Sequence, residues 1–115
     1  MRYMLLIYTS EKNDLQPGKD GFDEMMAGYG AFTQEVMGNG TFHAGDQLVP
    51  TAMAKTARVR DGKTLVTDGP FAETTEQLGG YYILNCETVD EALAYAAKIP
   101  GAKHGSVEVR QIVEM

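Results

Sequence analysis

Two segments of the chain are apolar at nearly every position. Residues 1–8 read MRYMLLIY and residues 80–87 read GYYILNCE, so apolar side chains fall on both alternating faces. Successive side chains of a strand point to opposite faces of a sheet, so both segments are predicted to be strands covered on two sides. Residues 106–113 alternate valine with charged residues, which is typical of a strand with one wet face.

Two other segments repeat apolar residues at three- and four-residue steps, the spacing of an amphipathic helix. The first follows Asp20, its expected cap, and ends at the Gly-Asn-Gly of residues 38–40. The second begins at Thr88, in the capping box of residues 88–91, and ends before Pro100.

Shorter strand-like segments lie between the first helix and the second apolar strand. Residues 41–48 form one, and residues 57–67 form a predicted hairpin whose Asp61-Gly62 turn favours positive φ. The order is strand, helix, strand, inserted hairpin, strand, helix, strand, the split βαβ plan of a ferredoxin-like α+β domain. The two apolar strands occupy its central positions, so pattern and topology agree on a single domain over residues 1–115.

Both helices of such a domain cover the same face of the sheet, yet the other face also carries apolar side chains that need cover. A second copy of the chain is the economical cover, and a homodimer is therefore predicted. The sequence leaves open which set of first-strand residues lies at the dimer interface: Met4, Leu6 and Tyr8, or Tyr3, Leu5 and Ile7.

Composition excludes several classes of protein. The chain of 115 residues has 10 basic and 16 acidic residues, a net charge of -6, and no basic cluster longer than residues 58–60. Nucleic-acid binding is therefore disfavoured. The apolar residues 1–8 are too short for a signal sequence or a membrane span. Cys86, the single cysteine, is expected to be a core residue and suits a reducing cytoplasm.

Asp46 is the candidate catalytic residue. A carboxyl group at the mouth of a crevice between two sheets can serve as acid or base, although an edge-strand charge that discourages wrong pairing is an equal alternative. His43 lies three residues earlier, so the two side chains are expected on opposite faces unless a bulge intervenes. His43 and His104 are expected to be surface residues. No residues have metal-ligand spacing, and neither a metal nor a cofactor is expected.

Candidate ligand-binding residues come from the central strands and from the segment that precedes the second one. Tyrosines there offer apolar walls with hydroxyl tips. In the segment Asp68-Gly69-Pro70-Phe71, Asp68 is expected to accept backbone N–H bonds, Gly69 to adopt positive φ and Phe71 to pin the loop to the core. A helical turn after Pro70 is expected to place acidic groups on the cleft rim, with Glu73, Glu76 and Gln77 on one face. The ligand-binding set is Tyr3, Tyr8, Tyr81, Tyr82, Asp68 and Glu73.

The segment DGPFAETTEQLGGYYIL, residues 68–84, resembles the DGPF-motif branch of the YCII-related family. MRYMLLIY near the start and IPGAKHGSVEVR near the end match the same pattern. The resemblance implies a dimeric α+β barrel of ferredoxin-like subunits. It also implies a cleft in which a histidine-aspartate pair has been proposed as acid/base machinery. A few relatives are dehydrochlorinases of chlorinated hydroquinones, and DGPF-type domains also occur beside extracytoplasmic-function sigma factors.

The chain departs from that pattern at two places. Residues 20–29, where the YCII branch has its histidine, contain none, and Thr75 replaces a lysine common in the motif. Asp46 falls where the resemblance expects the cleft carboxylate. Two functions therefore remain open. One is an enzyme or binding protein for a small, aromatic or phenolic molecule. The other is a non-enzymatic module that contacts a sigma factor.

Overall fold

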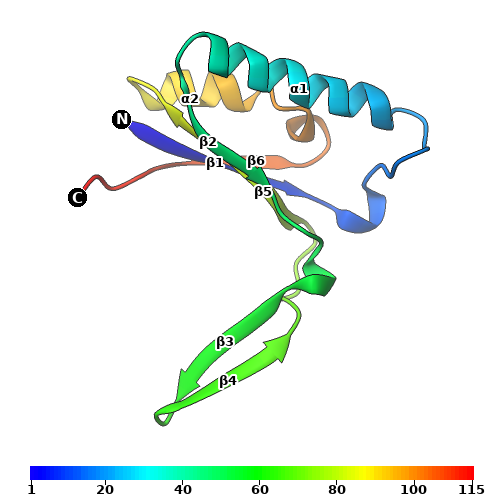
Figure 1. Cartoon of the computed structure of the whole chain (residues 1–115), viewed down its shortest axis with the longest axis vertical. Coiled ribbons are helices and arrows are strands. Elements are labelled where there is room, and N and C mark those ends of the chain that lie inside the picture. The colour runs from blue at the N-terminus through cyan, green and yellow to red at the C-terminus, as the bar shows by residue number, and fades with distance from the viewer.

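A four-stranded antiparallel sheet with two helices on one face forms the body of the protein (Figure 1). The computed structural model describes residues 1–115. The sheet has the order β2-β5-β1-β6, and a separate two-stranded hairpin is inserted between β2 and β5. The elements are β1 (Arg2–Thr9), η1 (Glu11–Asn13), α1 (Phe22–Gly38), β2 (Phe42–Gln47), η2 (Thr51–Met53), β3 (Lys55–Arg60), β4 (Lys63–Asp68), β5 (Gln77–Asn85), α2 (Val89–Ala96), η3 (Pro100–Lys103) and β6 (Ser106–Gln111).

The order confirms the predicted ferredoxin-like α+β plan, with an inserted hairpin. The two strands that are apolar on both faces, β1 and β5, lie side by side in the centre. The more polar β2 and β6 lie at the edges, where a strand has a neighbour on one side only. Neither helix has the length and apolar character needed to cross a bilayer.

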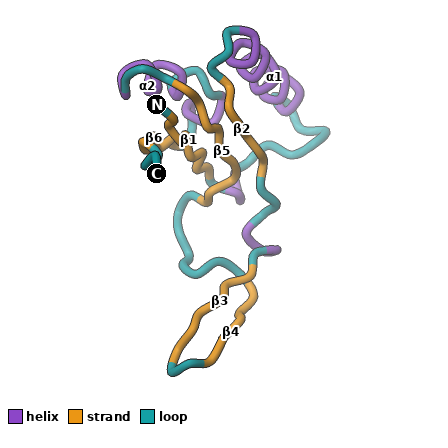
Figure 2. The backbone as a smooth tube through the Cα atoms, turned by 60° about the vertical axis from the view of Figure 1, so that its left-hand side comes forward, coloured by secondary structure: helices purple, strands orange, loops and turns teal.

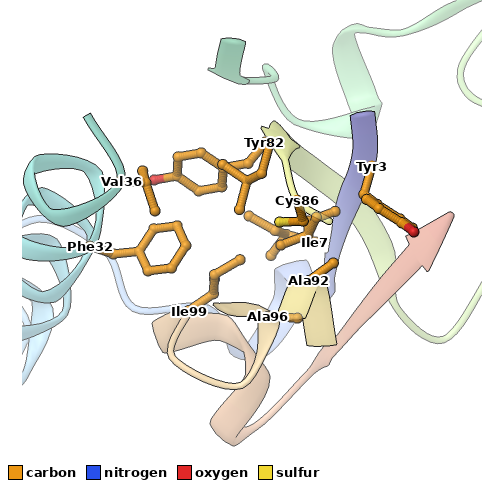
Figure 3. Close-up of a cluster of buried hydrophobic side chains, with 11 residues drawn as sticks. Tyr3, Ile7, Phe32, Val36, Tyr82, Cys86, Ala92, Ala96 and Ile99 are labelled. Carbon is orange, nitrogen blue, oxygen red and sulfur yellow. The ribbon is translucent and has the colours of Figure 1, made fainter. Parts of the chain in front are cut away.

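The core lies between the sheet and the two helices (Figure 3). From β1 it takes Tyr3, Leu5 and Ile7, so the structure decides which set faces the helices. The opposite set, Met4, Leu6 and Tyr8, remains half-buried on the open face of the sheet. Cys86 is also part of the core, as predicted, and its burial raises the pKa of the thiol.

The two helix starts differ in how well the sequence predicts them. The side chain of Thr88 accepts the backbone N–H of Glu91, as a capping residue should. Asp20 does not cap α1. The backbone N–H of Phe22 donates to Lys19, and this turn places Gly21 in the left-handed region with φ 88°, so that Gly21 becomes the cap.

The hairpin β3–β4 projects away from the body, and it does so on the side of the sheet opposite the helices (Figures 1 and 2). Its turn has φ 52° at Asp61 and 75° at Gly62, which confirms the predicted positive-φ connection. No residue of either strand is buried. The hairpin is therefore held to the body at its base and is open to solvent along its length.

Candidate functional site

Antiparallel pairing lines up two rows of side chains across the open face of the sheet. In the first row Asp46 lies opposite Tyr81, Tyr81 opposite Leu6, and Leu6 opposite Glu108. Three strand spacings separate the two acidic ends by about 14 Å. The neighbouring row is more apolar and runs across the same four strands as Ala44, Ile83, Met4 and Arg110.

Asp46 and Tyr81 form a direct side-chain hydrogen bond between β2 and β5 in the first row of this face. The hydroxyl of Tyr81 donates to Oδ2 of Asp46 at 2.8 Å. The bond and the negative charge of Asp46 raise the pKa of Tyr81, with partial desolvation as a further cause. Tyr81 therefore remains a neutral donor at physiological pH, and its hydroxyl orients the carboxylate. The geometry suits Asp46 as the proton acceptor of the pair.

The structure does not bring the four candidate tyrosines together. Tyr8 and Tyr81 belong to the open face, whereas Tyr3 and Tyr82 lie on the helix side and are buried in the core. The hydroxyl groups of Tyr82 and Thr33 are 2.8 Å apart and share a hydrogen bond between β5 and α1. Tyr82 thus bonds α1 to the sheet and Tyr3 packs in the core, which leaves Tyr8 and Tyr81 as the candidate tyrosines of the open face.

His43 is the extra residue of a bulge in β2. Phe42 pairs with Leu84 and Ala44 with the adjacent Ile83, so His43 has no partner on β5. The bulge lies at His43 itself, not at Gly45, and it changes the alternation on which the expected opposite placement rested. The side chain is exposed and makes no hydrogen bond with Asp46. His104 is also exposed, directly after η3.

The turn at residues 68–71 differs from its predicted construction. Asp68 accepts no backbone N–H bond; its Oδ1 lies 2.6 Å from Nζ of Lys55 in an exposed ion pair. Gly69 closes the base of the hairpin instead, because its N–H donates to Ala54 and its carbonyl accepts from Thr56. Gly69 has the expected positive φ of 93°. Phe71, expected in the core, is 78% exposed, so it does not pin the loop to its own chain.

A polar groove of about 360 Å³ follows this turn and is lined by residues 10–12, 74, 75 and 77. The expected helical turn after Pro70 is absent, because residues 70–76 are irregular and Gln77 already belongs to β5. Glu73 is exposed and does not line the groove, whereas Glu76 accepts the hydroxyl of Ser106. Glu11 binds Thr51 through both carboxylate oxygens. The lining lacks hydrophobic side chains, unlike that of most small-molecule sites.

The arginines do not form one cluster. Arg2 is paired with Glu114, which raises the pKa of Arg2 and lowers that of Glu114. Arg110 belongs to the second row of the open face. Arg58 and Arg60, two positions apart on β3, share one face of the hairpin.

A family model described as the YCII-related domain matches residues 1–115. The chain belongs to the YCII-related family. It is 38% identical over 114 residues to an uncharacterised protein of Rhizobium meliloti strain 1021. That match covers 97% of this chain and 92% of the relative.

The fold of this family member is also similar to a solved structure. That structure is 5-chloro-2-hydroxyhydroquinone dehydrochlorinase (TftG) from Burkholderia phenoliruptrix AC1100, in complex with 2,5-dihydroxybenzoquinone. The TM-score is 0.56 at 13% identity, and the match covers 100% of this chain and 96% of TftG. At this identity the likeness establishes the fold.

The start of α1, where the resemblance expects a histidine, supplies no acid or base on its inward face. Phe22 and Met25 are half-buried there and Met26 is exposed, and none of them transfers a proton. Thr75 lines the polar groove, where it offers a hydroxyl in place of the lysine charge. Among the candidate residues, Asp46 and Tyr81 thus form the pair in which a hydrogen bond orients a group that can serve as acid or base. Sequence reasoning found both residues, but no local signal indicated that they bond to each other.

Proposed function

We propose that this YCII-related protein binds a small aromatic or phenolic molecule on the open face of its sheet, where a second subunit closes the site. The observation that carries the proposal is the hydrogen bond from Tyr81 to Asp46, beside the apolar Leu6. Ligand sites typically join apolar walls to a few oriented polar groups. Tyr8 and Tyr81 supply rings with polar tips, and Met4 and Leu6 supply the apolar floor.

Asp46 acts in this proposal as the acid/base group. When a chlorinated hydroquinone loses hydrogen chloride, the ring first tautomerises, so that the carbon bearing chlorine gains a proton. A hydroxyl proton then passes to a base while its oxygen becomes a carbonyl and chloride leaves as the anion, which gives a quinone; a carboxylate can accept that hydroxyl proton. Tyr81, kept protonated by its raised pKa, orients Asp46 or donates to a substrate oxygen. The dehydrochlorinase activity and quinone ligand named for TftG support this class of ligand.

The alternative is a non-enzymatic interaction module whose partner is an extracytoplasmic-function sigma factor. The absence of a histidine bonded to Asp46 favours it, because the acid/base pair of the family resemblance is then incomplete. In this alternative the exposed hairpin is the surface that a protein partner contacts, and substitution of Asp46 leaves that binding unchanged.

Calorimetric titration with 2,5-dihydroxybenzoquinone tests the first proposal. Tyr81→Phe loses the hydroxyl donor of the pair, and Asp46→Asn keeps a side-chain oxygen but loses the negative charge; Asp23→Asn on the exposed first turn of α1 is the matched control. A hydrogen bond that involves a charge is worth enough to weaken binding about tenfold or more when it is lost. The control is expected to bind as the unchanged protein does.

A spectroscopic readout separates the pair from a general loss of structure. In Asp46→Asn the charge is gone, so the pKa of Tyr81 should fall back toward about 10 in a titration followed by NMR of labelled tyrosine rings. The proposal fails if the unchanged protein does not bind the quinone at millimolar concentration. It also fails if both site variants bind it as tightly as the control.

A further inference from the structure

The hairpin makes the chain far more extended than its length requires. The radius of gyration is 16.0 Å, compared with about 13 Å for a compact chain of this length. The accessible surface is 8006 Å², compared with about 6,200 Å² for a monomer of this mass. Roughly 1,800 Å² of surface is therefore present in excess of a compact monomer.

The hairpin has two chemically different faces, because residues paired across an antiparallel ladder share a face. Ala57 pairs with Val66, and Val59 with Thr64; these four form the apolar face, which ends at the Lys55–Asp68 ion pair at the base of the hairpin. Arg58 pairs with Leu65 on the other face. That second face, here called the basic face, comprises Thr56, Arg58, Arg60, Lys63, Leu65 and Thr67.

The chain itself leaves the apolar face uncovered. Val59 is 64% exposed and Val66 is 62% exposed. An isolated two-stranded hairpin is marginally stable in water and normally needs a packing partner on its apolar face. Phe71, at the base of the hairpin, is even more exposed. These residues therefore have the composition of an interface but no partner within the chain.

The position of the hairpin points to what covers it. It extends from the side of the sheet opposite the helices, so it stands beside the open face (Figures 1 and 2). Six residues per strand give it a reach of about 20 Å. A molecule that packs on the open face therefore lies within reach of the hairpin.

Charge favours a second copy of the chain as that molecule. The hairpin, residues 55–68, carries four basic and two acidic side chains, although the net charge of the whole chain is -6. The rest of the chain consequently has a net charge of -8. Opposite charges of this kind steer two copies so that the hairpin of one approaches the body of the other.

We propose that the hairpin β3–β4 is an arm that clasps a second copy of this chain, with Ala57, Val59 and Val66 packed against the partner. The excess of roughly 1,800 Å² per chain falls in the range that obligate dimers bury on each subunit. The inference rests on the open-face dimer of the proposed function, but not on its ligand. Two-fold symmetry lets each copy give one arm and receive another.

Two neighbouring residues of β4 provide a matched pair of variants. Val66→Asp places a charge on the apolar face, whereas Leu65→Asp places the same charge on the basic face of the same strand. Sedimentation equilibrium then measures the dimer dissociation constant. A buried interface anchor that becomes charged should weaken the dimer about 30-fold or more, and the control should change it less than about threefold.

A shortened arm guards against a hairpin that merely fails to form. Deletion of residues 57–60 and 63–66 joins the paired Thr56 and Thr67 through the same Asp61-Gly62 turn. Four pairs are removed, so Thr56 and Thr67 keep the same type of ladder pair beside the turn. The body should fold as before by circular dichroism, because the deletion removes no buried residue. Its dimer should be weaker by about 30-fold or more.

The outcomes separate the arm from the open face. A full-length chain that stays monomeric at high micromolar concentration overturns both the arm and the dimer of the proposed function. A dimer that tolerates Val66→Asp and the shortened arm, but is lost on Leu6→Asp, overturns the arm alone. Equal weakening by Val66→Asp and Leu65→Asp also overturns it, because the proposal assigns the contact to one face.

Discussion

The body and the hairpin arm use the same alternation of side chains, yet the outcome of folding differs between them. In β5 the alternate residues Tyr82 and Leu84 are buried under the helices. In the arm, Val59 of β3 and Val66 of β4 lie on the apolar face, and both remain exposed. Alternation therefore identifies an amphipathic strand, whereas burial depends on what lies above it.

The two sides of the sheet differ in the same way. The helix side of the sheet is closed by a core, and its tyrosines serve packing and one hydrogen bond to α1. The open side keeps Asp46 and Tyr81 accessible and lies next to the arm. In both proposals the ligand and the partner subunit occupy this uncovered side of the single chain, so the candidate site and the arm lie on the same side of the molecule.

The largest expected effect tests the closed side. Leu84 is fully buried, so Leu84→Ala should lower the free energy of unfolding by about 2–5 kcal/mol. Leu65→Ala, on the exposed basic face of the arm, should change it by less than about 0.5 kcal/mol. Urea denaturation of both variants measures the contrast. Similar losses at the two positions would mean that the arm is as well packed as the core.

Two glycines extend the comparison to the backbone. Gly105 lies directly before β6, and a Cβ there would overlap the carbonyl oxygen of Tyr8. Gly105→Ala should therefore lower the free energy of unfolding by about 1–3 kcal/mol. Gly62 lies at the tip of the arm with φ 75° and open space around it. The strain of Gly62→Ala opens the tip locally and should leave the unfolding of the body unchanged. Hydrogen exchange of arm and body amides distinguishes these results.

Local signals explain what could be predicted from the sequence. Thr88 caps its helix and Asp61-Gly62 forms its turn, because each depends on bonds or dihedral angles within a few residues. The strand order followed because β1 and β5 are apolar on both faces. The hydrogen bond between Asp46 and Tyr81, in contrast, joins residues 35 positions apart. The register of β2 against β5 decides that these two residues face each other, and no signal near either residue reveals that register.

The predictions that failed depended on context outside the segment. Asp20 has the right chemistry for a cap, but the turn before it shifts the start of α1 by one residue. Phe71 is apolar enough for a core, yet the projecting arm carries it away from one. The bulge that frees His43 from its partner likewise arises from the way β2 pairs with β5.

The smallest expected effect concerns Asp68 at the base of the arm. Its carboxylate is 85% exposed and its one bond is the ion pair with Lys55, so solvent screens the interaction. Exposed pairs of this kind contribute between about 0 and 1 kcal/mol. Asp68→Asn and Asp68→Ala should therefore behave alike, each within about 0.5 kcal/mol of the unchanged protein in urea denaturation. Gly69, whose backbone closes the hairpin, is untouched in both.

If Ala destabilised the protein by more than about 1 kcal/mol while Asn did not, the side-chain oxygen would accept backbone bonds in solution. The turn at residue 68 would then depend on its aspartate after all.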